Sequence, residues 1–413
     1  MLALIVIAAI PYGTVEPWWK AAFVCSVFGL CIVALIEIGS SKIQGGAILL
    51  PMLALAALAF VQTLSLGTLE VAGFSVWNTI SADPYQTRFF SLQMFALTAC
   101  LALFYRYANT ERRMRILVYT ILAVAIASAV FGILRHTTQH QTGFLLPLLK
   151  PNQGYGQFIN KNHFAYLMEM AFGLGLGITI AGGVKRERLL IYFALLLPIW
   201  TALVLSNSRG GILAMLVQIV VATLFLMRRQ SVVLKAVLVI VLVVGILFGT
   251  LWVGGDRLAS NFEAATNEFS ATSAGASRNE IWRATLKMFA AHPILGVGLG
   301  GYWIGITAYH DASGLMTPQE AHNDYLELLS SGGVIGFAIG VWFAVAVVRA
   351  ARRNLSDEMH PVRIGAILGI VGVAAHSLVD FGLHILVNAI VFIALIMMAT
   401  TRIDPCHPRS SAA

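Results

Sequence analysis

Charged side chains are scarce in this chain. Asp, Glu, Lys and Arg together make up 11% of its 413 residues, whereas 58% of the residues are hydrophobic. A soluble protein of this size could not hide so much apolar surface in one core. The composition therefore excludes an ordinary soluble enzyme or binding module and predicts an integral membrane protein.

Cysteines and internal repeats are also lacking. Of the four cysteines, Cys25, Cys31 and Cys100 lie in apolar runs and Cys406 lies near the C-terminus, so no disulfide framework is indicated. The chain shows no soluble-domain linker, and we treat residues 1–413 as a single membrane domain. The absence of an internal repeat argues mildly against the common transporter folds, many of which are built from two repeats.

A formal net charge of +8 could indicate binding to nucleic acid. In a membrane protein another interpretation is stronger, because basic residues collect in cytoplasmic loops. We therefore predict no nucleic-acid partner.

Twelve apolar runs are candidates for membrane-spanning helices, since about 20 apolar residues are needed to cross the hydrocarbon layer. They lie near residues 2–11, 20–38, 47–64, 89–107, 116–134, 162–182, 189–205, 212–227, 232–253, 332–348, 364–380 and 383–400. The first run is too short to cross alone, and it lacks the basic start of a signal peptide. Either it packs tilted and partly buried, or the true start of the protein lies upstream.

The distribution of basic residues predicts the orientation of these runs. With the N-terminus inside, most basic residues fall in inside loops: Lys42, Arg106, Arg112, Arg113, Arg115, Lys185, Arg186, Arg188, Arg228, Arg229, Lys235, Arg349, Arg352, Arg353, Arg363, Arg402 and Arg409. The positive-inside rule then predicts twelve spans with both ends in the cytoplasm. A large periplasmic loop covers residues 254–331, and a second outside stretch covers residues 135–161.

Arg209 stands between two apolar runs, within the segment SNSRGG. A tight hairpin that uses Gly210 and Gly211 would explain the glycines but does not need an arginine. Burial of an arginine near lipid costs several kcal/mol unless it is paired, although a snorkelling arginine at a helix end is common. An outward arginine flanked by the Ser208 hydroxyl and glycine amides suits a phosphate group.

The segment SRNEIWRATLKMFA, residues 277–290, predicts an amphipathic helix, with Ser277 and Glu280 as a capping box. The residues on one side of this helix are Ile281, Trp282, Thr285, Met288 and Phe289. Arg278 lies in the middle of that side, whereas Arg283 and Lys287 lie on the opposite, solvated side. Arg278 therefore points toward the membrane or a cavity, where it either snorkels or binds a ligand.

A glycine-rich loop, HPILGVGLGGY, follows at residues 292–302. Its backbone amides could surround a phosphate. The loop lacks the Lys-Ser/Thr ending of a nucleotide P-loop, and a plain turn is the stronger interpretation.

The segment AHNDYLELL begins at Ala321 and leads into the tenth run. Its polar residues could simply start a helix. His322, outside and near the bilayer, is also a candidate general base, and Asp324 or Glu327 could orient its ring.

Two further histidine segments adjoin apolar runs. His376, Asp380 and His384 have a spacing that could bind zinc on one helix face. However, Asp380-Phe381-Gly382 should break the helix, so a hydrogen-bonded turn is favoured over a metal site. The segment NKNHF at residues 160–164 contains Asn162 and His163, and an N-cap by Asn160 or Asn162 would explain it structurally.

Together these segments resemble the O-antigen ligase and polymerase superfamily. The matching pieces are FINKNHFAYLMEM at residues 158–170, SNSRGG at 206–211, SRNEIWRATLKMFAAHPILGVGLGGY at 277–302, HNDYLELLSSGGVIG at 322–336 and HSLVDFGLH at 376–384. They occur in order over the C-terminal two-thirds of the chain, whereas the N-terminal third contributes only hydrophobicity.

The resemblance implies an all-α membrane bundle of the C-type glycosyltransferase kind in the bacterial inner membrane, with its active site on the periplasmic side. It implies transfer of a glycan from an undecaprenyl-pyrophosphate carrier to an acceptor hydroxyl, without a metal or other cofactor and with inversion of the anomeric centre. By motif, Arg209 and Arg278 would hold the pyrophosphate and His322 would assist the acceptor. Ser208 and Gly210 join the donor site, and Asn162, His163, Asp324, His376 and Asp380 are secondary candidates.

The acceptor distinguishes the possible functions. A ligase uses lipid A core, a polymerase uses another lipid-linked glycan, and a protein O-oligosaccharyltransferase uses Ser or Thr but usually has a longer C-terminal extension. The NKNHF segment is similar to that of exopolysaccharide polymerase relatives. The alternative from another class is a transporter, which should place charged residues near the bilayer midplane.

Overall fold

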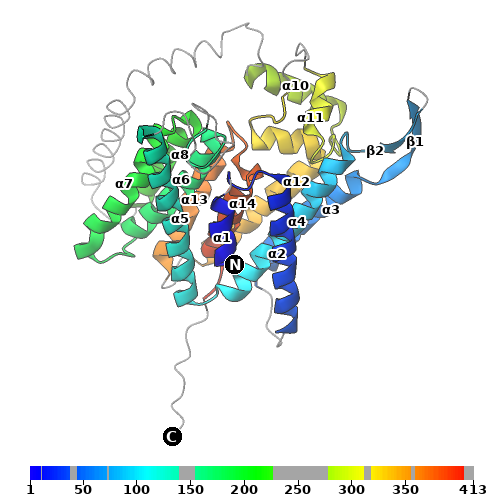
Figure 1. The fold of residues 1–413 in the computed structure, drawn as a ribbon. Helices are drawn as coiled ribbons and strands as arrows, with labels where there is room; N and C mark the ends of the chain where they lie inside the picture. Colours follow the sequence, from blue (N-terminus) through cyan, green and yellow to red (C-terminus); the bar gives the residue numbers. More distant parts are fainter. Residues whose placement is uncertain are drawn as a thin grey trace.

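The structure is a computed structural model that describes residues 1–10, 12–37, 44–71, 74–138, 154–226, 278–310, 318–354 and 359–403. These residues form a bundle of helices with one β-hairpin (Figure 1). The helices are α1 (Leu2–Ala9), α2 (Pro17–Ile36), α3 (Gly46–Gln62), α4 (Pro84–Tyr107), α5 (Glu111–Thr138), α6 (Lys161–Ile180), η1 (Arg186–Arg188), α7 (Leu189–Leu205), α8 (Arg209–Leu226), α10 (Arg278–Ala291), α11 (Tyr302–Gly305), η2 (Ile306–Ala308), α12 (Asp324–Arg353), α13 (His360–His376), η3 (Gly382–His384) and α14 (Leu386–Thr400).

Eleven of the twelve predicted apolar runs are helices in the structure, and the run near 232–253 lies outside the described residues. Within the described part of the chain, six helices are long and apolar enough to cross a membrane. They are α2, α4, α5, α6, α12, and the continuous helix formed by η1 and α7. Four shorter apolar helices, α3, α8, α13 and α14, accompany them. This is the mostly helical membrane protein that the composition predicts. With 8 residues, α1 is about 12 Å long and too short to cross alone.

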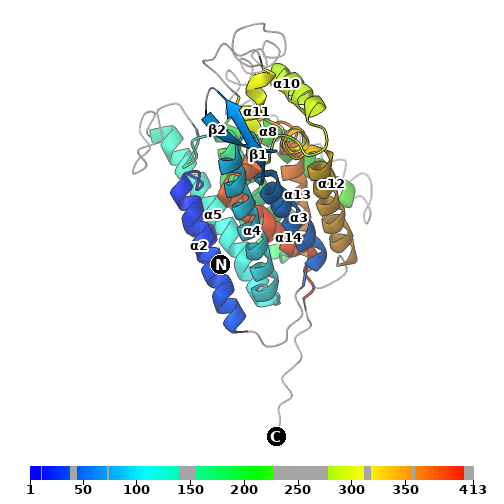
Figure 2. The ribbon, with the colours of Figure 1, turned by 90° about the vertical axis from the view of Figure 1, so that its right-hand side faces the viewer.

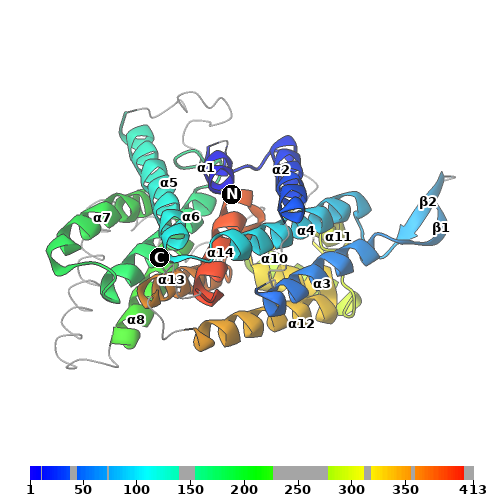
Figure 3. The same cartoon turned by 90° about the horizontal axis from the view of Figure 1, so that it is seen from below.

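Helices α6 and α14 form the centre of the bundle, and nearly all of their residues are buried. Seen from below, α5, α7, α8 and α13 lie on one side and α2, α3, α4 and α12 on the other, with α14 between them (Figure 3). Small residues allow close contact between α6 and α13. A Cβ on Gly173 would lie 2.6 Å from the Gly369 nitrogen, and one on Gly177 would lie 2.3 Å from the Gly365 Cα, so α6 and α13 meet backbone to backbone.

The glycine-rich loop is a structural connection, as predicted. Backbone N–H groups of Val297 and Gly298 donate to the carbonyl oxygens of Ser330 and Ser331 at 3.2 and 3.0 Å. α12 is interrupted just beyond, at Gly333, whose φ of 62° favours glycine. The next amides, of Leu299 and Gly300, donate to the side chains of Gln62 and Thr87 at 3.0 and 3.1 Å. Because these four amides are engaged within the fold, they do not surround a phosphate.

The β-hairpin was not predicted. Strands β1 (Ser65–Val71) and β2 (Phe74–Thr79) pair antiparallel and join α3 to α4. Figures 1 and 2 place the hairpin at the same end of the bundle as α10 and α11. Its short strands gave no clear signal among the long apolar runs on either side. The three cysteines in the described residues are free, as expected.

Candidate functional site

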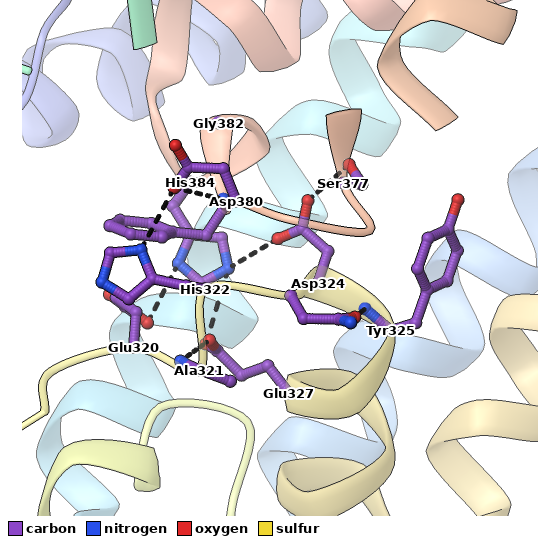
Figure 4. A network of polar contacts seen from close by, with 12 residues as sticks. Glu320, Ala321, His322, Asp324, Tyr325, Glu327, Ser377, Asp380, Gly382 and His384 are labelled. Atoms are coloured by element: carbon purple, nitrogen blue, oxygen red, sulfur yellow. Dashed lines mark hydrogen bonds and ion pairs between the residues drawn. The ribbon is translucent and has the colours of Figure 1, made fainter. Parts of the chain in front are cut away.

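The candidate site forms where the turn after α13 meets the start of α12. The backbone N–H of Asp324 donates to the carbonyl of Ser377 at 3.0 Å, and the Ser377 hydroxyl donates to Asp324 Oδ2 at 2.6 Å. Asn323 caps α12 by accepting from the amides of Tyr325 and Leu326. These contacts bring together two segments that lie more than 50 residues apart in the chain (Figure 4).

His322 precedes the cap of α12, and its side chain faces the turn after α13. Its Nδ1 donates a long hydrogen bond of 3.4 Å to Asp380 Oδ1, and its ring contacts the Phe381 ring edge to face at 4.9 Å. The side chain is 34% exposed, so a substrate can reach it. Its backbone has a φ of 51°, a strained conformation for a non-glycine residue that occurs frequently at functional sites.

Asp380 orients the His322 ring. The sequence suggested Asp324 or Glu327 for this role, but neither bonds to His322 among the described contacts. The Asp380 side chain is 1% exposed, and its Oδ1 also accepts from the Phe381 amide at 3.0 Å. Burial alone would raise the pKa of the Asp380 carboxyl, but the hydrogen bond from His322 and the nearby rings of His376 and His163 lower it below its ordinary value. An ionised carboxylate that holds Nδ1–H leaves Nε2 of the imidazole free to accept a proton.

Asp324 and Glu327 instead surround His384, together with Glu320. His384 Nδ1 lies 3.5 Å from Glu320, and its Nε2 lies 3.7 Å from Asp324 and 3.6 Å from Glu327. Burial alone would lower the pKa of the His384 ring, but the carboxylates outweigh burial and raise that pKa to about 10. Burial alone would raise the pKa of Glu320, but His384 lowers it below its ordinary value. His384 is therefore a cation at neutral pH.

The zinc set considered from the sequence does not form, because its members have separate partners. His376 bonds to Glu169, Asp380 bonds to His322, and His384 contacts Glu320, Asp324 and Glu327. As predicted, the segment after α13 is a turn, with α13 ending at His376 and α14 starting at Leu386. In the described part of the chain, the set that could hold a metal ion is Glu320, Glu327 and His384, whose ligand atoms lie within 4.8 Å of one another.

The charge on His384 should make the stability of the protein depend on pH. A histidine whose pKa rises on folding, here from about 6.5 to about 10, stabilises the fold fully below about pH 6.5 and loses that effect as the pH approaches 10. We therefore expect the melting temperature of the wild type to exceed that of His384→Gln at pH 6.5, and the difference to shrink toward pH 10. Thermal melts of both purified proteins at several pH values test this. A difference that stays constant would contradict the assignment.

Arg209 begins α8 and is exposed. Ser208 is buried, and its hydroxyl oxygen accepts from the Gly211 amide at 3.2 Å, so this side chain caps the helix. A Cβ on Gly210 would lie 2.4 Å from His376 Nε2 and 3.1 Å from Val379 Cγ2. The first turn of α8 therefore packs on the same turn that carries Asp380.

Arg278 begins α10 and is half-buried. The burial pattern confirms the predicted faces, because Ile281, Thr285 and Met288 are buried whereas Arg283 and Lys287 are exposed. One helical turn beyond Arg278, the Trp282 indole donates to the carbonyl of Ala321 at 3.0 Å, next to His322. This contact attaches α10 to the site. Ser277, the predicted cap, lies outside the described residues.

His163 and Asn162 lie at the start of α6. Asn160 caps the helix by accepting from the Asn162 amide at 2.9 Å, which confirms the structural interpretation of this segment. The His163 ring is buried against Phe381 at 5.0 Å. Phe381 thus contacts three histidine rings, those of His163, His322 and His384.

Sequence reasoning missed two acidic residues of this region. Glu320 stands just before the matched segment at 322–336 and carried no signal. Glu169 lies in the middle of α6, fully buried, with Oε2 2.8 Å from His376 Nδ1. Its signal was the presence of a carboxylate inside an apolar run, which is expensive unless paired.

Residues 191–341 match the family model described as O-antigen ligase. The matched part contains Arg209, Arg278 and His322 and ends before Asp380. A search of curated proteins found no match.

Proposed function

Since the chain belongs to the O-antigen ligase superfamily, we propose that it transfers a glycan from an undecaprenyl-pyrophosphate carrier to an acceptor hydroxyl at the periplasmic face of the bacterial inner membrane. The observation that carries this proposal is the His322–Asp380 pair. Asp380 of this pair lies on the turn that contacts the first residues of α8, which Arg209 begins.

In the proposed reaction, Nε2 of His322 accepts the proton of the acceptor hydroxyl while the hydroxyl oxygen bonds to the anomeric carbon. The bond from that carbon to the pyrophosphate oxygen breaks, and undecaprenyl pyrophosphate leaves with the electron pair. Arg209 and Arg278 stabilise the negative charge that grows on the leaving group. Attack from the face opposite the leaving group inverts the anomeric centre.

The test is transfer by purified protein in detergent, with a synthetic lipid-linked donor and acceptor. We expect a longer or newly attached glycan, and unchanged turnover in EDTA because the proposed reaction is metal-independent. Turnover that vanishes with EDTA would instead favour a metal at Glu320, Glu327 and His384. Lipid A core or a second lipid-linked glycan as acceptor separates a ligase from a polymerase, and a Ser- or Thr-containing peptide tests protein glycosylation.

A transporter is the competing function, and one observation favours it. Glu169 and His376 form a buried ionisable pair, and Glu169 lies in the middle of an apolar helix. Detergent solution has no two compartments between which a substrate could move. Glycan transfer in detergent would therefore identify an enzyme, whereas its absence together with glycan flux into vesicles would identify a transporter.

The proposal requires the loop at residues 254–331 to be periplasmic. We expect a periplasmic signal from a reporter fused near Asn267 and a cytoplasmic signal from one fused near Arg352, because the basic residues gather in the loops assigned to the cytoplasm. Paired alkaline phosphatase and fluorescent-protein fusions measure this. A cytoplasmic signal near Asn267 would reverse the topology and remove the periplasmic mechanism.

A further inference from the structure

The proposed reaction makes no use of the Glu169–His376 pair. Both side chains are fully buried, one in the middle of α6 and the other at the end of α13. Ionisable side chains inside a membrane protein are expensive, and those that persist usually have a function. This pair therefore requires an explanation beyond packing.

The His376 ring is held on two sides. Nδ1 donates to Glu169 Oε2 at 2.8 Å, and the ring stacks on Tyr166 with centroids 4.1 Å apart and an interplanar angle of 14°. A carboxylate on one ring nitrogen selects the tautomer and orients the other nitrogen. In His376 that other nitrogen, Nε2, is buried and has no hydrogen-bond partner among the described residues.

Nε2 faces the first turn of α8. A Cβ on Gly210 would lie 2.4 Å from Nε2 and 2.5 Å from the ring carbon Cδ2, so only glycine fits beside the ring. The N-terminus of a helix carries a partial positive charge, which favours the lone pair that Nε2 presents. The edge of the His376 ring thus determines where the residue after Arg209 can lie.

The backbone of His376 is joined to the acceptor side of the site. The carbonyl of His376 accepts from the Asp380 amide at 3.1 Å, one turn before the carboxylate that holds His322. His376 thus packs its ring against Gly210, the residue after Arg209, and supports the turn of Asp380 with its backbone carbonyl.

We propose that His376, oriented by Glu169, is a positioning residue that sets the first turn of α8 so that Arg209 meets the pyrophosphate of the donor. This inference rests on the proposed function and adds two residues to it. Neither residue contacts the reacting atoms. Their effect should appear in donor binding, because Arg209, which they position, is the residue proposed to hold the pyrophosphate. A displacement of about 1 Å at such a turn can also cost about 10²-fold in rate.

The first experiment uses Glu169→Gln, which keeps the shape and an oxygen acceptor but removes the charge. We expect a higher KM for the donor, weaker binding of undecaprenyl pyrophosphate and an unchanged KM for the acceptor. Thr179→Val is the matched control, since Thr179 is also buried in α6 and bonds to its own helix. The control should transfer like the wild type.

The second experiment separates positioning from folding. Gly210→Ala should strain the protein against the ring and lower both its melting temperature and donor binding. In the double variant Gly210→Ala/His376→Ala the clash is gone, so its melting temperature should fall by less than the sum of the two single-variant effects, while undecaprenyl pyrophosphate binding stays weak. Wild-type binding of undecaprenyl pyrophosphate by the double variant would show that the ring serves only as packing and would overturn the inference.

Two outcomes distinguish this inference from the function on which it rests. If the wild type transfers glycan and Glu169→Gln has the same donor KM, the inference fails and the function stands. If the wild type neither transfers glycan nor binds undecaprenyl pyrophosphate, the proposed function fails and the inference fails with it.

Discussion

Replacement of His322 by alanine is expected to lower the rate of glycan transfer by about 10²–10⁴-fold, the usual cost of removing a general base. An alcohol is a poor nucleophile at neutral pH, and its proton must leave as the new bond forms. Binding of the lipid-linked donor should remain close to that of the wild type, because the arginines that would hold the pyrophosphate are untouched. Transfer by the purified variant, together with a donor-binding measurement, gives both quantities.

Two further variants separate orientation of the ring from proton transfer. His322→Gln can retain a hydrogen bond but cannot accept the proton, so it should be almost as slow as alanine. Asp380→Asn keeps the shape of the turn but removes the charge that holds Nδ1–H of His322. This variant should insert into the membrane normally but transfer glycan much more slowly than the wild type. Full turnover by His322→Ala would eliminate this residue as the base.

Alanine at Arg209 or Arg278 is expected to reduce transfer by about 10²–10³-fold or more, as when a charge-stabilising donor is lost from a transition state. Both variants should still insert in the membrane, because Arg209 is exposed and Arg278 is only half-buried. Lysine keeps the charge but loses the planar, two-pronged geometry of the guanidinium, so Arg→Lys should recover only part of the activity. Transfer rates of protein normalised by immunoblot measure these effects.

The matched controls lie on the same amphipathic helix. Arg283→Ala and Lys287→Ala remove positive charge from the exposed face of α10 and should change the rate only slightly. If positive charge attracted the donor only in a general way, alanine at each of the four cations would lower the transfer rate by a similar amount. These cations are Arg209, Arg278, Arg283 and Lys287. Normal glycan length and yield from Arg278→Ala would mean that this arginine only snorkels at the membrane surface.

Much of the fold could be predicted because it follows from local patterns. Long apolar runs indicated the spans, and eleven of the twelve are helices in the structure. The 3.6-residue period of residues 277–290 predicted which face of α10 is buried. The segment Asp380-Phe381-Gly382 predicted the break between the last two helices. A hydrophobic period or a helix-breaking residue acts within a few residues, so neighbours in the chain are sufficient to reveal it.

The β-hairpin and the break in α12 could not be predicted in the same way. Gly333 looks like any other glycine in an apolar run until the loop at residues 292–302 packs beside it. Likewise, the amides of that loop looked available for a phosphate until Ser330, Ser331, Gln62 and Thr87 engaged them. Distant segments decided both the break at Gly333 and the partners of these amides.

The sequence by itself determined the chemical types of the candidate site, namely arginines for an anion and a histidine for a hydroxyl. Only the tertiary structure decided their partners. It paired His322 with Asp380 rather than with Asp324 or Glu327, gathered three carboxylates around His384, and paired Glu169 of α6 with His376 of α13. The reason is physical: helix packing brings together residues 50 to 200 positions apart, and a polar group buried there bonds to whichever partner the packing places within about 3 Å.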